Sequence, residues 1–325
     1  MNRKRGALLL LRRRSLFSVP RFWFSPALAL TFSALSAIAA LGSHTAEAAI
    51  ELRDDRGIAV RLPAPAQRIV ALAPSLTELV YAAGAGRHLV GVARFSDYPA
   101  EAQRVTQVGD AARVDIERIA ALEPHLVLAW KSGNQAGDID KLARLGHAVF
   151  VTEPVRLADI PRLLRAIGAL AGTGSAAERA ARAFQDGVLS MRTRYAVARK
   201  VRALYEVWHR PLITVSGRHM ISDVITLCGG KNVFADAPGL TPSVSLEAVV
   251  AAGAEVILGG ARAGSEADFR REWRQAPVAV LRSLPVFYVD PDLIQRQTPR
   301  ILEGAKTICA ALDTVRRNTV VNRRR

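Results

Sequence analysis

Aromatic side chains stand at the ends of several expected strands. Tyr98 and Trp208 lie on loops that follow expected strands, and Trp130 ends the strand expected over residues 126–130. Core packing does not require a ring on a loop, and rings at loop mouths suit a large, flat, apolar ligand. Core packing explains each ring equally well on its own. Their recurrence at analogous strand ends favours a binding site.

A charged pair, Asp292 and Arg296, lies in the segment leading into the last expected helix. These side chains could hydrogen-bond the amide or carboxylate edges of a ligand. The alternative is a surface ion pair, which contributes roughly 0 to 1 kcal/mol to stability.

Catalytic motifs are missing from the sequence. It has no Gly-x-Ser-x-Gly, no His-Glu-x-x-His and no phosphate-binding glycine-rich loop with Lys-Ser or Lys-Thr. Most of its six histidines lie in the leader or next to expected strands, which leaves His209 and His219 as candidate ligands. We therefore predict a binding protein without cofactor or metal site, with an enzyme as the alternative of another class.

The net charge of +16 lies mostly at the two ends of the 325-residue chain. Residues 1–48 carry seven Lys or Arg against one acid, and residues 316–325 carry five Arg and no acid. The remainder is only mildly basic and has no nucleic-acid recognition motif, so nucleic acid is not a predicted partner.

The N-terminus has the pattern of an export signal. A basic leader precedes an apolar segment, residues 26–41, and the small-x-small site Ala46-Glu47-Ala48. The pattern predicts a signal peptide over 1–48, a mature chain from Ala49 and a periplasmic location. The alternative is an uncleaved membrane anchor, but the apolar segment is shorter than the roughly 20 residues that a span needs. The export route stays open.

Two cysteines, Cys228 and Cys309, remain after cleavage. In an oxidising compartment a disulfide between them is the natural hypothesis, and two buried free thiols are the alternative.

Strands alternate with helices on both sides of one long amphipathic helix. A hairpin is expected over 50–62, Ser75 and Glu78 form a capping-box start for a short helix, and Ser175 and Glu178 form another for the long one. We predict an α/β fold of two Rossmann-like lobes, 49–174 and 199–325, joined by a linking helix, 175–198, with a ligand cleft between them. The alternative for that helix is a crossover within one sheet.

Several segments of the chain form a pattern that recurs in one known family: Ser96–Pro99, Glu117–Ile119, Ala129–Trp130 with Gly133–Asn134, Cys228–Gly230, and Arg296 with Pro299–Arg300. These segments resemble periplasmic cobalamin-binding proteins of ABC importers, which belong to the class III binding proteins with a helical backbone. The resemblance covers nearly the whole mature chain. It implies two lobes joined by one long helix, small closure motions, and a disulfide at the two cysteines.

The resemblance also implies roles for individual residues. Tyr98, Trp130 and Trp208 match aromatic positions that line the corrin, and Asp292 and Arg296 match polar contacts to its edge. The implied partners are cobalamin, as a transported ligand, and the permease, with the binding protein itself a monomer.

Two glutamates, Glu117 and Glu247, match the acidic residues that dock onto arginines of the permease. One glutamate in each lobe would fix the orientation of docking, because paired complementary charges set register. The alternative is that each carboxylate only favours the N-terminal end of its own helix.

Two positions depart from the family pattern. Ala111 and Thr241 stand where the family has tryptophans, so the pocket would lose two large rings. A related corrinoid, a haem or a ferric siderophore are therefore alternative ligands. Haem-binding relatives usually supply an axial tyrosine in the loop at 108–110, and this chain has none there.

Overall fold

The computed structural model describes residues 49–260 and 265–322. The predicted signal peptide, 1–48, and the basic tail, 323–325, lie outside this range. Within the described residues, none of the helices is both long enough and apolar enough to span a membrane. The described chain begins with an antiparallel hairpin, as expected, formed by β1 (Ile50–Arg53) and β2 (Ala59–Leu62).

The first lobe contains a parallel four-stranded sheet in the order β4-β3-β5-β6. Its strands are β3 (Ile69–Ala71), β4 (Leu89–Val92), β5 (Leu126–Trp130) and β6 (Val149–Thr152). Side chains alternate between its faces: Ile69 packs in the cluster that holds α2 (Pro74–Ala82) and α5 (Asp159–Ala171), whereas Val70 packs with α3 (Ile116–Ala121) and α4 (Ala136–Arg144). Both faces are therefore covered, which explains the nearly continuous apolar strands.

The second lobe repeats this topology. Its parallel sheet has the order β10-β9-β7-β8, formed by β7 (Val201–Glu206), β8 (Gly230–Asn232), β9 (Val256–Gly259) and β10 (Val286–Tyr288). Read from the other edge, the order is that of the first sheet, with β7 in the place of β3. One face packs on α7 (Met220–Leu227) and α12 (Ile301–Asn322), and the other on α8 (Leu246–Ala251), α9 (Glu266–Arg274) and α10 (Ala279–Arg282). The remaining short elements are 3₁₀ turns at Gly86–His88 and Ala100–Arg104 and a one-turn helix, α11 (Pro291–Ile294).

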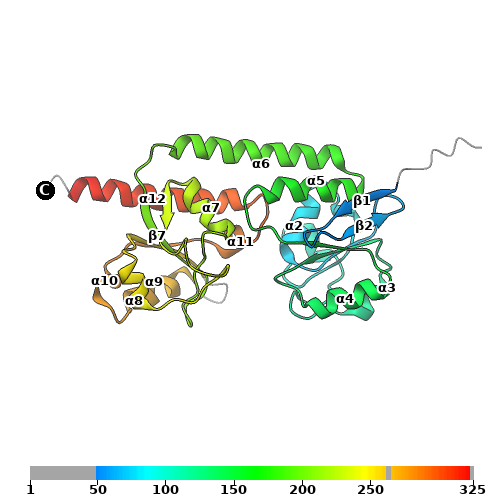
Figure 1. Cartoon of the computed structure of the whole chain (residues 1–325), viewed down its shortest axis with the longest axis horizontal. Coiled ribbons are helices and arrows are strands. Elements are labelled where there is room, and N and C mark those ends of the chain that lie inside the picture. The colour runs from blue at the N-terminus through cyan, green and yellow to red at the C-terminus, as the bar shows by residue number, and fades with distance from the viewer. Residues whose placement is uncertain (1–48, 261–264, 323–325) are drawn as a thin grey trace, which may run out of the picture. The chain divides into compact units, whose positions relative to one another are not determined.

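The long helix α6 (Gly174–Tyr195) lies across both lobes, alongside α5 at one end and α12 at the other (Figure 1). Its buried residues Ala177, Ala181 and Phe184 belong to an apolar cluster that includes residues of both sheets. The predicted α/β fold, with two parallel sheets and a long connecting helix, is confirmed. The exact lobe boundaries stay a prediction, although α6 ends three residues before the expected 198.

The predicted capping box at the start of α6 is wrong. Thr173 precedes the helix, and no side chain caps it. Glu178 instead accepts hydrogen bonds from Arg165 of α5 and Arg182 one turn later. These two arginines lower the pKa of Glu178 to about 2. The carboxylate of a capping-box glutamate can pair either with a backbone amide or with a nearby arginine, and Glu178 pairs with the arginines.

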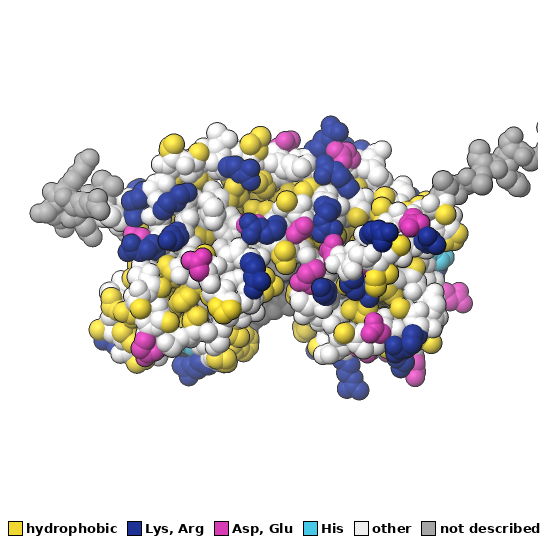
Figure 2. Space-filling view, in the orientation of Figure 1, with side chains coloured by type: hydrophobic (Ala, Val, Ile, Leu, Met, Phe, Trp, Pro, Cys, Tyr) yellow, Lys and Arg dark blue, Asp and Glu magenta, His cyan; other side chains and the backbone are white. Residues whose placement is uncertain are grey.

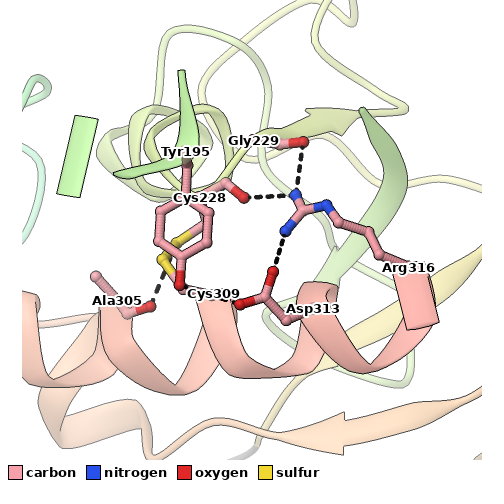
Figure 3. The surroundings of a disulfide bond; sticks show 7 residues. All are labelled: Tyr195, Cys228, Gly229, Ala305, Cys309, Asp313 and Arg316. Atoms are coloured by element: carbon pink, nitrogen blue, oxygen red, sulfur yellow. Dashed lines mark hydrogen bonds and ion pairs between the residues drawn. A yellow bond between two sulfur atoms is a disulfide. The ribbon is translucent and has the colours of Figure 1, made fainter. Parts of the chain in front are cut away.

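A disulfide joins Cys228, at the end of α7, to Cys309 of α12 (Figure 3). The alternative of two free thiols is therefore wrong. Beside the bridge, the Arg316 guanidinium donates to the carbonyl oxygens of Cys228 and Gly229 and pairs with Asp313, which also accepts from Tyr195 at the end of α6. The bridge and these bonds hold the ends of α6 and α7 against the middle of α12.

Charged side chains are mixed on the face drawn in Figure 2. Lys and Arg are spread over this face with Asp and Glu between them, and its lower edge is hollowed between the two lobes. On this face the basic residues do not gather over one element.

Candidate functional site

The three candidate rings lie at the carboxyl ends of strands or in the loops that follow them. Trp130 is the last residue of β5, Tyr98 lies in the loop after β4, and Trp208 lies two residues after β7. Tyr98 and Trp208 are 45% and 47% exposed, and Trp130 is partly buried. Ligands of open α/β sheets bind at this edge, because there the loops diverge from a rigid sheet.

Trp130 is held in place by the two residues that the family resemblance singled out after it. A side-chain carbon added to Gly133 would lie 1.9 Å from the Trp130 ring, so only glycine allows this approach. Asn134 accepts from the Trp130 amide at 2.7 Å and donates to the carbonyl oxygens of Leu72 and Ala111, each at 2.9 Å. Asn134 thereby ties β5 to the end of β3 and to the loop that carries Ala111.

Trp208 lies on its own small hairpin. Its backbone pairs with Ile213, and its indole Nε1 donates to the Arg210 carbonyl oxygen at 2.9 Å. These contacts fix the base of the ring while leaving about half of it exposed. The hydrogen bonds and ion pairs described for the chain do not join Trp208 to the other candidate residues.

Arg296 forms a buried ion-pair network rather than a surface pair. Its Nη2 lies 3.0 Å from Asp292 Oδ1, as the spacing of four predicts, but the Arg296 side chain is only 4% exposed. Its Nη1 donates across to the first lobe, to Glu78 Oε1 at 2.9 Å and Asp97 Oδ1 at 2.7 Å, and Nη2 donates to the Phe95 carbonyl oxygen at 3.4 Å. The interpretation as a surface ion pair is therefore wrong.

Glu78 lies buried within α2 and does not cap its start. It was expected to cap the start of its helix, but α2 begins at Pro74 and lacks a side-chain cap. The Glu78 side chain is 2% exposed and also accepts from Thr298 Oγ1 at 2.8 Å and Arg300 Nη1 at 3.1 Å. We call this group the Glu78 cluster; it consists of Glu78, Asp97, Asp292, Arg296, Thr298 and Arg300.

A sequence signal for this role did exist. Glu78 lies among Leu76, Leu79 and Val80, all buried on α2. A carboxylate within such an apolar stretch must find a cationic partner, since an unpaired buried charge is very costly. The sequence does not show that this partner is Arg296, which lies 218 residues away.

The charges of the Glu78 cluster keep Arg296 ionised. Burial on its own lowers the pKa of Arg296, but hydrogen bonds to Asp97 and Glu78 and the charge of Asp292 outweigh burial and raise it above its ordinary value. Its Nε is buried and has no hydrogen-bond partner in the described structure. The Arg300 guanidinium stacks over the Tyr98 ring, 3.8 Å from its centre, so the cluster also positions Tyr98. The cluster thus brings Tyr98, Asp292 and Arg296 together.

The two candidate docking glutamates occupy equivalent places in the two lobes. Glu117 lies in the first turn of α3, which Asp115 caps, and Glu247 lies in the first turn of α8, which Ser245 caps. Both side chains are exposed. A hydrogen bond from its own backbone amide and another with Ser245 lower the pKa of Glu247.

The two departures from the family pattern are also equivalent in topology. Ala111 lies in the loop between β4 and α3, and Thr241 lies in the loop between β8 and α8. Ala111 is half-buried and Thr241 is exposed. The same loop of each lobe therefore carries a residue without an aromatic ring at this position.

The two candidate histidines differ in role. His219 caps α7, where its Nδ1 accepts from the Ile221 amide at 3.1 Å, and burial lowers its pKa to about 4. A neutral imidazole used as a helix cap explains this histidine without a ligand. His209 lies between two glutamates, Glu206 and Glu272.

Known proteins are similar to this chain over most of its length. The family model described as "Periplasmic binding protein" matches residues 69–278. The vitamin B12-binding protein of Vibrio parahaemolyticus is 34% identical over 253 residues, which are 78% of this chain and 92% of that protein. The vitamin B12-binding protein of Yersinia pestis is 35% identical over 255 residues, 78% of this chain and 89% of that protein.

A solved structure has the same fold. The crystal structure of the periplasmic vitamin B12 binding protein BtuF of Vibrio cholerae superposes with a TM-score of 0.70 at 33% identity, covering 78% of this chain and 98% of that one. In this chain the two parallel sheets have the same strand order and one long helix joins them. The match covers nearly the full length of these relatives. The chain therefore belongs to the periplasmic binding protein family.

Proposed function

We propose that this chain is the substrate-binding component of an ABC importer, and that it captures cobalamin between its two lobes and delivers it to the permease. The observation that carries this proposal is that aromatic and charged side chains follow strand ends in both sheets. The vitamin B12-binding relatives, which share a third of their residues with this chain, support the choice of ligand.

In this proposal Tyr98, Trp130 and Trp208 contact the corrin, and Asp292 contacts its polar edge. Arg296 acts mainly as a positioning residue, because its Nη atoms are engaged by the Glu78 cluster. Its Nε has no hydrogen-bond partner in the described structure but is buried away from solvent. With Ala111 and Thr241 in place of rings, a related corrinoid, a haem or a ferric siderophore are the competing ligands.

The same proposal includes export, location, oligomeric state and the absence of a catalysed reaction. The first 48 residues direct export and are removed, the mature protein works in the periplasm as a monomer, and it carries out no reaction on its ligand. Recovering cyanocobalamin unchanged after incubation with the purified protein separates binding from catalysis; a converted product contradicts the proposal.

Calorimetric titration with cyanocobalamin, hemin and a ferric siderophore tests the ligand directly. We expect saturable 1:1 binding of cyanocobalamin and weaker or no binding of the other two. Binding of hemin without binding of cyanocobalamin would show that the cargo has been misassigned.

Replacing Trp130 by alanine should weaken cyanocobalamin binding by roughly 1 to 3 kcal/mol, because a ring that packs against a ligand loses its buried apolar area. The measurement is the dissociation constant by calorimetry. Lys131→Ala is the matched control, since Lys131 is the exposed neighbour of Trp130. Equal affinity of Trp130→Ala and the wild type would remove Trp130 from the site.

Reversing both docking charges, Glu117→Arg with Glu247→Arg, should abolish cobalamin uptake by cells and leave cobalamin binding intact. The physical reason is that like charges on the binding protein and on arginines of the permease repel each other. Glu101→Arg with Glu303→Arg changes the charge equally at two other exposed glutamates and should preserve uptake. Loss of ligand binding in the first double variant contradicts the docking role.

A further inference from the structure

Three side chains beside the Trp208 hairpin present metal-ligating atoms to one point. Glu206, the last residue of β7, His209, and Glu272 of α9 each place one ligand atom within 4.8 Å of the other two. His209 Nδ1 lies 3.3 Å from Glu206 Oε1 and 3.8 Å from Glu272 Oε2. We call these residues the Glu206 cluster.

Neighbouring groups hold the Glu206 cluster in this arrangement. Glu206 is 1% exposed, and its Oε2 accepts from the indole nitrogen of the fully buried Trp273. That bond leaves Oε1 facing His209, whose ring stands edge-on to Trp273 with 5.7 Å between the ring centres. His209 Nδ1 is itself buried and makes no hydrogen bond in the described structure. A polar ring atom is thus enclosed next to a carboxylate oxygen without a satisfied contact.

One of the three ligand spacings already matches a tetrahedral metal ion. Zn²⁺ binds histidine nitrogen and carboxylate oxygen at about 2.0 to 2.2 Å, which places neighbouring ligand atoms about 3.3 to 3.6 Å apart. The distance of 3.3 Å between His209 Nδ1 and Glu206 Oε1 lies in this range, the distance of 3.8 Å to Glu272 is longer, and all three ligand atoms lie within 4.8 Å of one another. Glu272 is partly exposed at the surface, so its side chain can move to close the remaining distance.

Charge and access also suit a divalent cation. Two carboxylates balance a charge of +2, and a dication compensates the buried Glu206 carboxylate, which otherwise has a high desolvation cost. A pocket of about 560 Å³, lined by His209, Glu272 and Trp273 among others, opens beside the cluster. It gives an ion a path from solvent and gives water room to complete the coordination.

We propose that Glu206, His209 and Glu272 bind one divalent transition-metal ion with the ligand preferences of Zn²⁺. Such an ion ties the base of the Trp208 hairpin to α9. The proposal is independent of the transported ligand, since none of its three residues belongs to the proposed cobalamin site. The sequence offered no metal motif because Glu272 lies 63 residues beyond His209.

The competing occupant is a proton. A protonated His209 would form ion pairs with both glutamates, and the nearby Glu206 carboxylate raises the pKa of His209 against the opposing effect of burial. A proton and a metal ion compete for the same nitrogen, so binding of the metal must weaken as pH falls through the range in which His209 is protonated.

The test uses the untagged protein, stripped with chelator and dialysed, and titrated with Zn²⁺ alone at pH 7.5. Calorimetry and elemental analysis after gel filtration should show one Zn²⁺ per chain with a micromolar or lower dissociation constant. His209→Gln should remove this site, and Glu272→Gln should weaken it at least tenfold.

Two controls and a second variant keep the test decisive. Glu266→Gln changes an exposed glutamate on the same helix, and His147→Gln removes a histidine from the other lobe; both should bind Zn²⁺ like the wild type. If His209→Gln fails to fold, Glu272→Gln still decides, because Glu272 is partly exposed. No binding by the wild type, or binding that neither His209→Gln nor Glu272→Gln changes, overturns the proposal and leaves the proton as the occupant.

Discussion

Replacing Glu78 by alanine should lower the free energy of unfolding by about 3 to 5 kcal/mol, the usual cost of removing one partner from a buried ion pair. The change removes the most buried of the three carboxylates that pair with Arg296, which is 4% exposed, and also removes an acceptor from Thr298 and Arg300. Urea denaturation followed by circular dichroism gives the measurement. Glu78→Gln retains an acceptor without the charge and should fall between alanine and the wild type.

An exposed pair of the same chemistry provides the control. Glu51 and Arg61 are 2.8 Å apart, against 2.9 Å for Glu78 and Arg296, but both lie in solvent on the hairpin. Glu51→Ala should leave the unfolding free energy nearly unchanged, because solvent screens such pairs. The two variants differ in burial and not in distance, so equal effects would contradict the role of the Glu78 cluster.

A double variant tests whether Glu78 and Arg296 act as a pair. Glu78→Ala with Arg296→Ala should cost clearly less than the sum of the two single changes, because each single change already breaks the Glu78–Arg296 hydrogen bond, which can be lost only once. Additive losses would mean that each side chain stabilises the fold separately. Since Glu78 belongs to the first lobe and Arg296 to the segment before α12, a measured coupling is also a measured contact between the lobes.

The bonds of the Glu78 cluster mean that α6 is one of several connections between the lobes. The length of α6 and the spacing of its apolar residues predicted two lobes joined by one helix, and the structure agrees. The lobes nevertheless meet elsewhere as well: Arg156, which follows β6, donates to the Gly217 carbonyl oxygen, and the Leu157 amide donates to Asp223 of α7. With the Glu78 cluster, these contacts explain why small closure motions are expected.

The features that depend on local sequence pattern could be predicted: the strands, the helices and the loops at strand ends. Apolar strands buried on both faces and helices of ordinary length identified both sheets, and loops at strand ends identified Tyr98, Trp130 and Trp208 as candidates. The equal strand order of the two sheets was not visible in sequence, because the fold and not local spacing decides which strands pair.

Long-range polar partners were beyond sequence reasoning. Glu78 and Arg296 are 218 residues apart, and Glu206 and Trp273 are 67 apart. Nothing in local spacing selects one arginine among the many in this chain. Burial of a carboxylate predicts that a partner exists, and only the fold determines which one it is.

Removing the disulfide with Cys228→Ala and Cys309→Ala should lower the unfolding free energy by roughly 2 to 4 kcal/mol, mainly because the unfolded chain gains freedom when a long loop is released. The bridge joins residues 81 apart in sequence. Alanine is preferred to serine because both positions are buried, and a buried hydroxyl without a partner adds its own cost. Urea denaturation of the double variant and the oxidised wild type gives the difference.

Reducing the disulfide distinguishes its contribution to stability from that of the contacts around it. Both cysteines are at most 2% exposed, so a reductant added to the folded protein should react slowly, whereas reduction in urea followed by refolding should reproduce the loss seen in the alanine variant. The reduced protein should still fold, because Arg316 and the shared apolar cluster continue to hold α7 against α12. Arg316→Gln in the oxidised protein is the matched test of those bonds. If reduced and oxidised proteins unfold at the same urea concentration, the bridge contributes no stability and the α7–α12 contact rests on packing and Arg316 alone.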